Sequence, residues 1–230
     1  MVPLEHGELL SSGYQGVVYK VPAGPDYPDA DYLIVKEAMG SALVRALRRW
    51  MIRREYRVYQ RLEGVAGVPR CFGLHEDRLL LEFIDGDPLR LSAGELADRD
   101  GFFGALLEIL QAIHRAGVAH SDMKRKDNVL VTPDGMPCLI DFGSAVLRHE
   151  NAGSWRNWLF REACQIDLNA WVKHKYLARY DTISAADARY YDPTLVERVS
   201  RPVRRTWRKL TGRQVRKARR RRASNSGSDG

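Results

Sequence analysis

The chain has 230 residues, 44% of them hydrophobic, which is enough for one two-lobed domain or two small ones. No run of 18 apolar residues occurs, and no basic segment followed by an apolar stretch opens the chain. Neither a transmembrane helix nor a secretory leader is therefore expected. The net charge of +8 belongs to the end of the chain, because residues 201–222 hold 12 Lys and Arg and no acid. Residues 1–200 hold 25 Lys and Arg against 28 acids. Three widely spaced cysteines lack metal-site spacing and fit a reducing cytoplasm.

Two strands joined by a turn-rich loop are predicted near the N-terminus. Alternation around residues 17–21 indicates the first strand, and Gly13 and Gly16 lie in the turn before it. Glycines let backbone N–H groups approach a phosphate closely, although an ordinary hairpin has the same pattern. The second strand, over residues 32–36, ends in Lys36.

A long helix is predicted over residues 41–63. Glu55 lies near its middle, 19 positions after Lys36, among many arginines. This glutamate either pairs with a neighbouring arginine on the surface or reaches Lys36. A strand over residues 78–84 follows, and residues 89–117 are mostly helical with a broad apolar face. The apolar positions of the long helix are Leu43, Leu47, Met51, Tyr56, Tyr59 and Leu62.

Three oxygen-bearing side chains are expected to converge between residues 120 and 141. Asp122 and Asn128 precede the apolar run 129–131, and Asp141 follows the apolar run 138–140. The Thr-Pro-Asp-Gly segment between the two runs is a strong turn signal, so a hairpin places Asn128 and Asp141 at neighbouring strand ends. Such a set suits a hard cation such as Mg²⁺ and the orientation of a hydroxyl nucleophile. The alternative is that these acids merely cap turns.

These motifs resemble the protein-kinase-like superfamily. His120-Ser121-Asp122 with Lys124 and Asn128, followed by Asp141-Phe142-Gly143, is similar to that fold's catalytic and metal loops. The family's glycine pattern maps onto Ser11, Gly13, Gly16 and Val18, with serine replacing the first glycine. The resemblance implies an α+β, two-lobed fold. The expected parts are a β-rich N-lobe (1–84), a mostly helical, reduced C-lobe (85–200) and a basic, partly disordered tail (201–230).

The resemblance also implies ATP and Mg²⁺ as cofactors and assigns roles to residues. Asp122 would orient the attacking hydroxyl, and Lys124 would neutralise charge near the γ-phosphate. Asn128 and Asp141 would hold the metal ion. The distance from Asp122 to Asn128 is one residue longer than usual, so Asp127 is the alternative ligand. Residues expected around the nucleotide are Gly13, Gly16, Val18, Lys36, Glu55 and the hinge residues Glu82 and Ile84.

Two departures from the family pattern bear on the substrate. Ser121 replaces the arginine that usually pairs with an activation-loop phosphate, so that style of regulation is not expected. No Ala-Pro-Glu element follows Asp141; a Trp-rich helix follows, whose Asp167 resembles the residue that braces the catalytic loop. Little room is left for peptide docking, which favours a small or lipid-bound acceptor.

Three functions are consistent with these features. The first is a kinase for a lipopolysaccharide core sugar, similar to compact bacterial Kdo or heptose kinases. It would be cytoplasmic and peripheral at the inner face of the membrane. The second is an atypical, compact serine/threonine protein kinase, and the third is a nucleotide-binding scaffold without activity. The basic tail, with Val203, Trp207 and Leu210 at helical spacing, would suit an anionic membrane surface or RNA.

Overall fold

The computed structural model describes residues 7–13, 16–149 and 153–192. By its contacts the chain divides into residues 1–191 and 192–230. The predicted tail, residues 201–230, lies outside the described residues. The lobe boundary expected at residues 84–85 stays a prediction. No helix in the described ranges is long and apolar enough to cross a bilayer.

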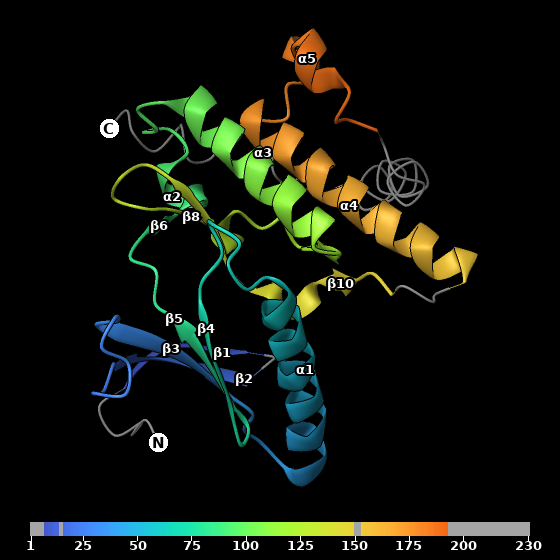
Figure 1. The fold of residues 1–230 in the computed structure, drawn as a ribbon. Helices are drawn as coiled ribbons and strands as arrows, with labels where there is room; N and C mark the ends of the chain where they lie inside the picture. Colours follow the sequence, from blue (N-terminus) through green and yellow to red (C-terminus); the bar gives the residue numbers. More distant parts are fainter. Residues whose placement is uncertain (1–6, 14–15, 150–152, 193–230) are drawn as a thin grey trace, which may run out of the picture. The chain divides into compact units, whose positions relative to one another are not determined.

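A five-stranded antiparallel sheet forms the N-terminal part, in the order β1-β2-β3-β5-β4 (Figure 1). The helix predicted over residues 41–63 is observed as α1 (Ala42–Arg61), between β3 and β4. Lys36 is on β3 and Glu55 is on α1, so strand and helix together position this pair. The strands are β1 (Glu8–Gly13), β2 (Gly16–Pro22), β3 (Tyr32–Glu37), β4 (Cys71–His75) and β5 (Arg78–Glu82).

The remaining part is mostly helical, with short strands that carry the loops of interest. The predicted hairpin is present, since β8 (Val129–Val131) pairs antiparallel with β9 (Pro137–Leu139). The fold is therefore α+β with a sheet-rich and a helical part, as the resemblance implied. The other elements are β6 (Asp87–Pro88), α2 (Leu89–Ser92), α3 (Arg99–Arg115), β7 (Val118–Ala119), η1 (Lys126–Asn128), η2 (Phe142–Ser144), β10 (Val146–Leu147), α4 (Ser154–Lys175), η3 (Tyr180–Thr182) and α5 (Ala185–Ala188).

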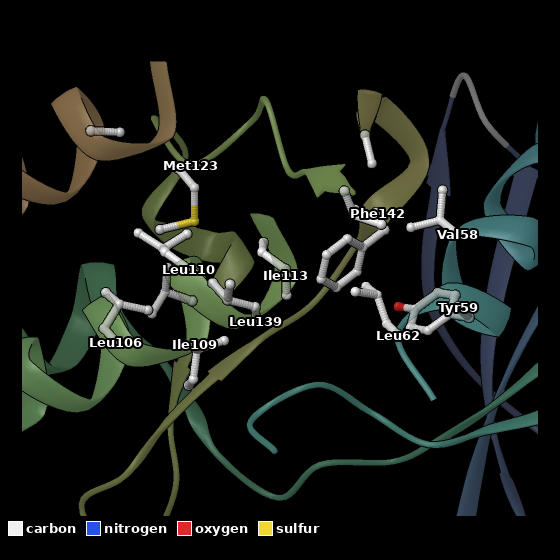
Figure 2. Close-up of a cluster of buried hydrophobic side chains, with 14 of the residues drawn as sticks. Val58, Tyr59, Leu62, Leu106, Ile109, Leu110, Ile113, Met123, Leu139 and Phe142 are labelled. Atoms are coloured by element: carbon white, nitrogen blue, oxygen red, sulfur yellow. The ribbon is translucent and has the colours of Figure 1, made fainter. Parts of the chain in front are cut away.

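One hydrophobic core links α1 to the helical part (Figure 2). Phe142 lies at its centre and meets the Tyr59 ring edge-on at 5.4 Å between ring centroids. Apolar residues of α3 and β9 continue the cluster on the other side. Because Phe142 follows Asp141 directly, burial of this ring fixes the place where the candidate metal loop leaves β9. The residues labelled in the cluster are Val58, Tyr59, Leu62, Leu106, Ile109, Leu110, Ile113, Met123, Leu139 and Phe142.

Candidate active site

Lys36 is the centre of a buried ionic cluster. Its Nζ lies 2.7 Å from Oε1 of Glu55 and 3.0 Å from Oδ1 of Asp141. The Glu55 side chain is almost fully buried, whereas that of Asp141 is about a third exposed. Of the two interpretations of Glu55, the structure supports the pair with Lys36. Three separate segments, β3, α1 and the loop after β9, are thus brought together by one ammonium group.

The cluster perturbs the titration of its members. Burial disfavours the charged form of Lys36, but the carboxylates of Glu55 and Asp141 outweigh it and raise the pKa of Lys36. Burial likewise works against the charge of Asp141, yet the Lys36 ammonium leaves the pKa of Asp141 below its ordinary value. Burial raises the pKa of Glu55. Lys36 therefore stays protonated and Asp141 ionised at neutral pH.

Asp122 and Asn128 meet in the loop before β8. The Nδ2 group of Asn128 donates to Oδ2 and to the carbonyl oxygen of Asp122, each at 3.2 Å. Asn128 is buried, whereas Asp127 pairs with Arg90 at 2.8 Å. Lys126–Asn128 form the short helix η1. Of the two alternatives for the metal ligand, the geometry favours Asn128, because Asp127 is engaged elsewhere.

The two loops are held against each other by main-chain and ring contacts. Nε2 of His120 lies 2.9 Å from the carbonyl oxygen of Ile140, and its ring packs on Phe142 with 4.8 Å between centroids. The N–H of Ile140 donates to the carbonyl oxygen of Asn128 at 3.0 Å. Asp141 itself has a left-handed backbone, with φ 63° and ψ 72°. A non-glycine residue persists in that conformation only where its surroundings over-determine it.

Asp167 on α4 braces the catalytic loop, as its sequence context predicted. Its fully buried carboxylate accepts the N–H groups of His120 at 2.7 Å and Ser121 at 2.8 Å. Nε2 of His114 lies 3.1 Å from the same carboxylate. Ser121 has a φ of 66°, so these bonds hold the residue before Asp122 in a strained conformation. Asp167 is thus a positioning residue for Asp122.

Two arginines of α1 have a role that the sequence did not reveal. Arg54 donates to the carbonyl oxygen of Gly143 at 2.9 Å and to that of Ala145. Arg61, two turns further along, donates to the carbonyl oxygen of Arg148 at 2.8 Å. Both therefore tie α1 to the segment after Asp141. In the sequence, the one sign that Arg54 could contact this segment was its position next to Glu55. A run of arginines on a helix otherwise suggests a solvated face.

The glycine turn lies beside the lysine strand. Gly13 pairs with Gly16 across the β1–β2 hairpin, and Val18 pairs with Lys36 across β2 and β3. A Cβ on Gly16, whose φ is 140°, would lie 2.4 Å from the carbonyl oxygen of Glu37. Glycine is therefore required there for close strand approach. Residues 14–15 at the tip of this turn lie outside the described residues.

Two predicted site residues, Glu82 and Ile84, lie apart from the cluster within the described ranges. Glu82 ends β5, where its carboxylate accepts the N–H of Arg70 at 2.9 Å, and Ile84 follows two residues later. Both line a hollow of about 690 Å³ together with residues of α3. Within the described ranges, neither shares a hydrogen bond or ion pair with Lys36. Lys124 is exposed on the catalytic loop. Their roles stay predictions.

The candidate metal ligands have the right chemistry for Mg²⁺. Asn128 directs its amide nitrogen to Asp122, which leaves the amide oxygen available, and Asp141 is ionised. No group of three or more His, Cys, Asp or Glu residues suited to a metal occurs in the part of the chain that the structure describes. Two protein oxygens fit Mg²⁺ nevertheless, because this ion is commonly bound by one or two side chains together with substrate phosphates and water.

A lysine–glutamate pair joined to a left-handed aspartate, beside a braced catalytic loop, defines the protein-kinase-like class. Within that class, the RIO domain family matches residues 34–169, more than half of the chain. The chain belongs to this family. The matched stretch includes Lys36, Glu55, Asp122, Asn128 and Asp141, whereas the glycine turn precedes it.

Two curated proteins are similar to the chain. The RIO-type serine/threonine-protein kinase Rio1 of Haloferax volcanii is 28% identical over 144 residues, which are 59% of this chain and 48% of that protein. The probable serine/threonine-protein kinase RTK1 of Saccharomyces cerevisiae is 39% identical over 72 residues, 30% of this chain and 12% of that protein. The chain thus spans about half or less of the length of these relatives.

Proposed function

We propose that the protein is an ATP-dependent kinase that transfers the γ-phosphate to a hydroxyl group. The observation that carries this proposal is the Lys36–Glu55–Asp141 cluster beside the Asp122–Asn128 pair. A nucleotide-binding scaffold has no need to keep a strained aspartate, a braced catalytic loop and a charged lysine in one place. Membership of the RIO domain family and the names of both relatives support the same activity.

The residues act mainly by positioning and by charge neutralisation. Lys36, held charged by Glu55, would donate to the α- and β-phosphates. Asn128 and Asp141 would hold Mg²⁺, which supplies further charge neutralisation at the phosphates when bound. The ion pair between Lys36 and Asp141 would fix the lysine relative to the proposed metal loop before the nucleotide binds. The chain therefore supplies a preorganised set of charges for the triphosphate.

Asp122 would orient the acceptor. Its carboxylate is about a third exposed, and the Asn128 amide fixes one of its oxygens. The other oxygen accepts a hydrogen bond from the incoming hydroxyl. The acceptor oxygen then bonds to the γ-phosphorus as the bond to the β–γ bridging oxygen breaks. The hydroxyl proton passes to Asp122 and ADP leaves with the bridging oxygen.

We favour a protein serine or threonine as the acceptor, because both relatives are named serine/threonine-protein kinases. The core sugar of a lipopolysaccharide remains a second candidate. It rests on the short segment after Asp141, and neither relative's name mentions a glycolipid. We also propose, from the sequence, that the protein is cytoplasmic and that, if the acceptor is a glycolipid, it works at the inner face of a membrane. The basic tail is proposed to bind lipid or RNA.

The test is γ-phosphate transfer from labelled ATP with Mg²⁺, offering a basic protein and purified core lipopolysaccharide in parallel. Asp122→Asn is expected to lower transfer at least 100-fold while ATP affinity stays within a few-fold. Asp134→Asn, in the exposed β8–β9 turn, is the matched control and should transfer normally. Label on the glycolipid alone would make the sugar kinase the better proposal. ATP binding without transfer to either acceptor, and without ATP hydrolysis, would favour the scaffold.

A further inference from the structure

The N-terminal turns of α1, with Met39 just before them, carry large apolar side chains that are exposed in the described chain. Leu43 is 84% exposed and Trp50 is 56% exposed, and Met39, Val44 and Leu47 are exposed as well. We call these five residues the α1 tip. In Figure 1 this end of the helix is the one away from α3 and α4. Monomeric proteins seldom expose so many large apolar side chains side by side.

The α1 tip differs from the rest of its helix. Leu43, Leu47 and Trp50 recur at spacings of four and three, so they share one face. Further along this face, Arg54 packs against the segment after Asp141. At Leu43 and Leu47 the same face is exposed, and Val44 broadens the apolar surface around the helix. All six residues from Ala42 to Leu47 are exposed.

Positive charge surrounds the α1 tip. Three of the seven arginines of α1 lie in its first turns, Arg45, Arg48 and Arg49, and the single acid of the helix is Glu55, which is buried against Lys36. Arg49 is paired with Asp77 of the β4–β5 turn. The N-terminal end of a helix also carries a partial positive charge. A partner that is both apolar and negatively charged therefore complements the tip best.

Two other occupants fit this surface less well. A second copy would bring the same arginine-rich helix against the first. RNA would satisfy the arginines but offers nothing to Leu43 and Leu47, because bases stack on aromatic rings and not on aliphatic side chains.

We propose that the α1 tip docks on the surface of a membrane that contains anionic lipid. Leucine and tryptophan would enter the boundary between headgroups and acyl chains, and the arginines behind them would contact lipid phosphates. Arg45, Arg48 and Arg49 occupy the other side of the same turns, as in an amphipathic helix that lies at a membrane surface. The proposal concerns binding alone and does not depend on kinase activity.

A second aromatic side chain lies next to this surface. Trp50 lines a hollow of about 310 Å³ together with Trp155 and Leu159 at the start of α4. Trp155 is 61% exposed, and Arg156 lines the same hollow. Tryptophan is enriched at the level of lipid headgroups because its ring is apolar and its N–H is polar. The start of α4 would therefore meet the same membrane surface.

The test uses the full chain and changes apolarity without changing charge. Leu43→Ser with Leu47→Ser is the tip variant, and Leu91→Ser with Leu177→Ser is the control. The control leucines are 59% and 51% exposed, so both variants should fold like the wild type. Binding is measured by flotation with phosphatidylcholine vesicles that contain roughly 30% phosphatidylglycerol, a composition that models the anionic leaflet. Tip-variant affinity is expected to fall at least tenfold, with control affinity unchanged.

Equal binding by the wild type and the tip variant would overturn the proposal, because the basic tail alone would then account for attachment. Equally tight binding to pure phosphatidylcholine would overturn the role of anionic lipid. A tip variant that lost affinity for single-stranded RNA or an acidic peptide by the same tenfold, with vesicle binding unchanged, would assign the surface to that partner instead.

Discussion

The substitution Asp167→Asn tests how the catalytic loop is held. The carboxylate of Asp167 accepts hydrogen bonds on both oxygens, from His120 and His114 on Oδ2 and from Ser121 on Oδ1. Asparagine has nearly the same volume but only one accepting oxygen. Whichever way the amide is turned, its NH₂ group faces a backbone N–H. The change therefore removes an acceptor without opening a cavity.

The cost follows from the loss of one acceptor. A hydrogen bond to a charged group contributes about 1.5–3 kcal/mol, and a buried N–H without an acceptor costs about 1–3 kcal/mol. The lost hydrogen bond and the unpaired N–H are two sides of the same change, so the two figures are not simply added. We expect the free energy of unfolding to fall by about 3 kcal/mol. That is a large share of the roughly 5–15 kcal/mol that holds a domain folded. Ser121 can then relax from its positive φ, which displaces Asp122.

Urea unfolding measures the stability of Asp167→Asn, and phosphotransfer measures its effect on Asp122. We expect kcat to fall at least tenfold while KM for ATP changes little, because Lys36 and Asp141 are untouched. Asp98→Asn is the matched control: Asp98 caps α3 by accepting the N–H of Gly101 at 2.8 Å, and asparagine caps equally well. A stability loss below about 1 kcal/mol for Asp167→Asn, on the scale of an ordinary neutral hydrogen bond, would refute the reasoning.

Two further predictions concern α1 and α4. Arg54→Ala is expected to lower kcat about tenfold, since loss of its two carbonyl contacts is worth at least about 1.4 kcal/mol. The control is Arg53→Ala, an exposed residue of the same helix, which should leave kcat unchanged. Equal effects of the two substitutions on kcat would contradict the anchoring role of Arg54. Burial lowers the pKa of His174 from 6.5 to about 4, although its Nε2 lies 2.6 Å from the carbonyl oxygen of Met123. Between those values the unfolded chain binds a proton that the folded chain does not. Stability should therefore fall by about 2 kcal/mol from pH 7 to pH 5. Urea unfolding of His174→Gln should lack this part of the slope, and identical slopes would contradict a buried neutral histidine.

The neighbouring places of Asn128 and Asp141 were predictable because a local signal fixes them, whereas the Lys36–Glu55 pair was implied only by the family resemblance. The Thr-Pro-Asp-Gly turn sets the β8–β9 pairing, and that pairing puts Asn128 and Asp141 at adjacent strand ends. The preference for Asn128 over Asp127 as the metal ligand stays a prediction, supported by the burial of Asn128, which spacing alone does not give. Asp127 is drawn away by Arg90, which lies 37 residues earlier in the chain.

The functions of the α1 residues were less predictable, since helical periodicity says which side chains share a face but not what covers it. Arg54 and Arg57 look alike in the sequence. The first contacts two carbonyl oxygens across the core, and the second bonds within its own helix. Leu43 and Tyr59 also look alike as apolar helix positions, yet one is exposed and the other buried. Tertiary contacts between distant segments make these differences.

The anchoring of the segment after Asp141 bears on regulation. Many kinases order this region with a phosphate that pairs with an arginine before the catalytic aspartate. Ser121 occupies that position here, and the segment is instead held by Arg54 through main-chain carbonyl oxygens. Carbonyl acceptors are always present, so this contact needs no modification. Because Arg54 adjoins Glu55, the helix that fixes Lys36 also fixes the segment after Asp141, so the arrangement proposed for phosphate binding is built into the fold.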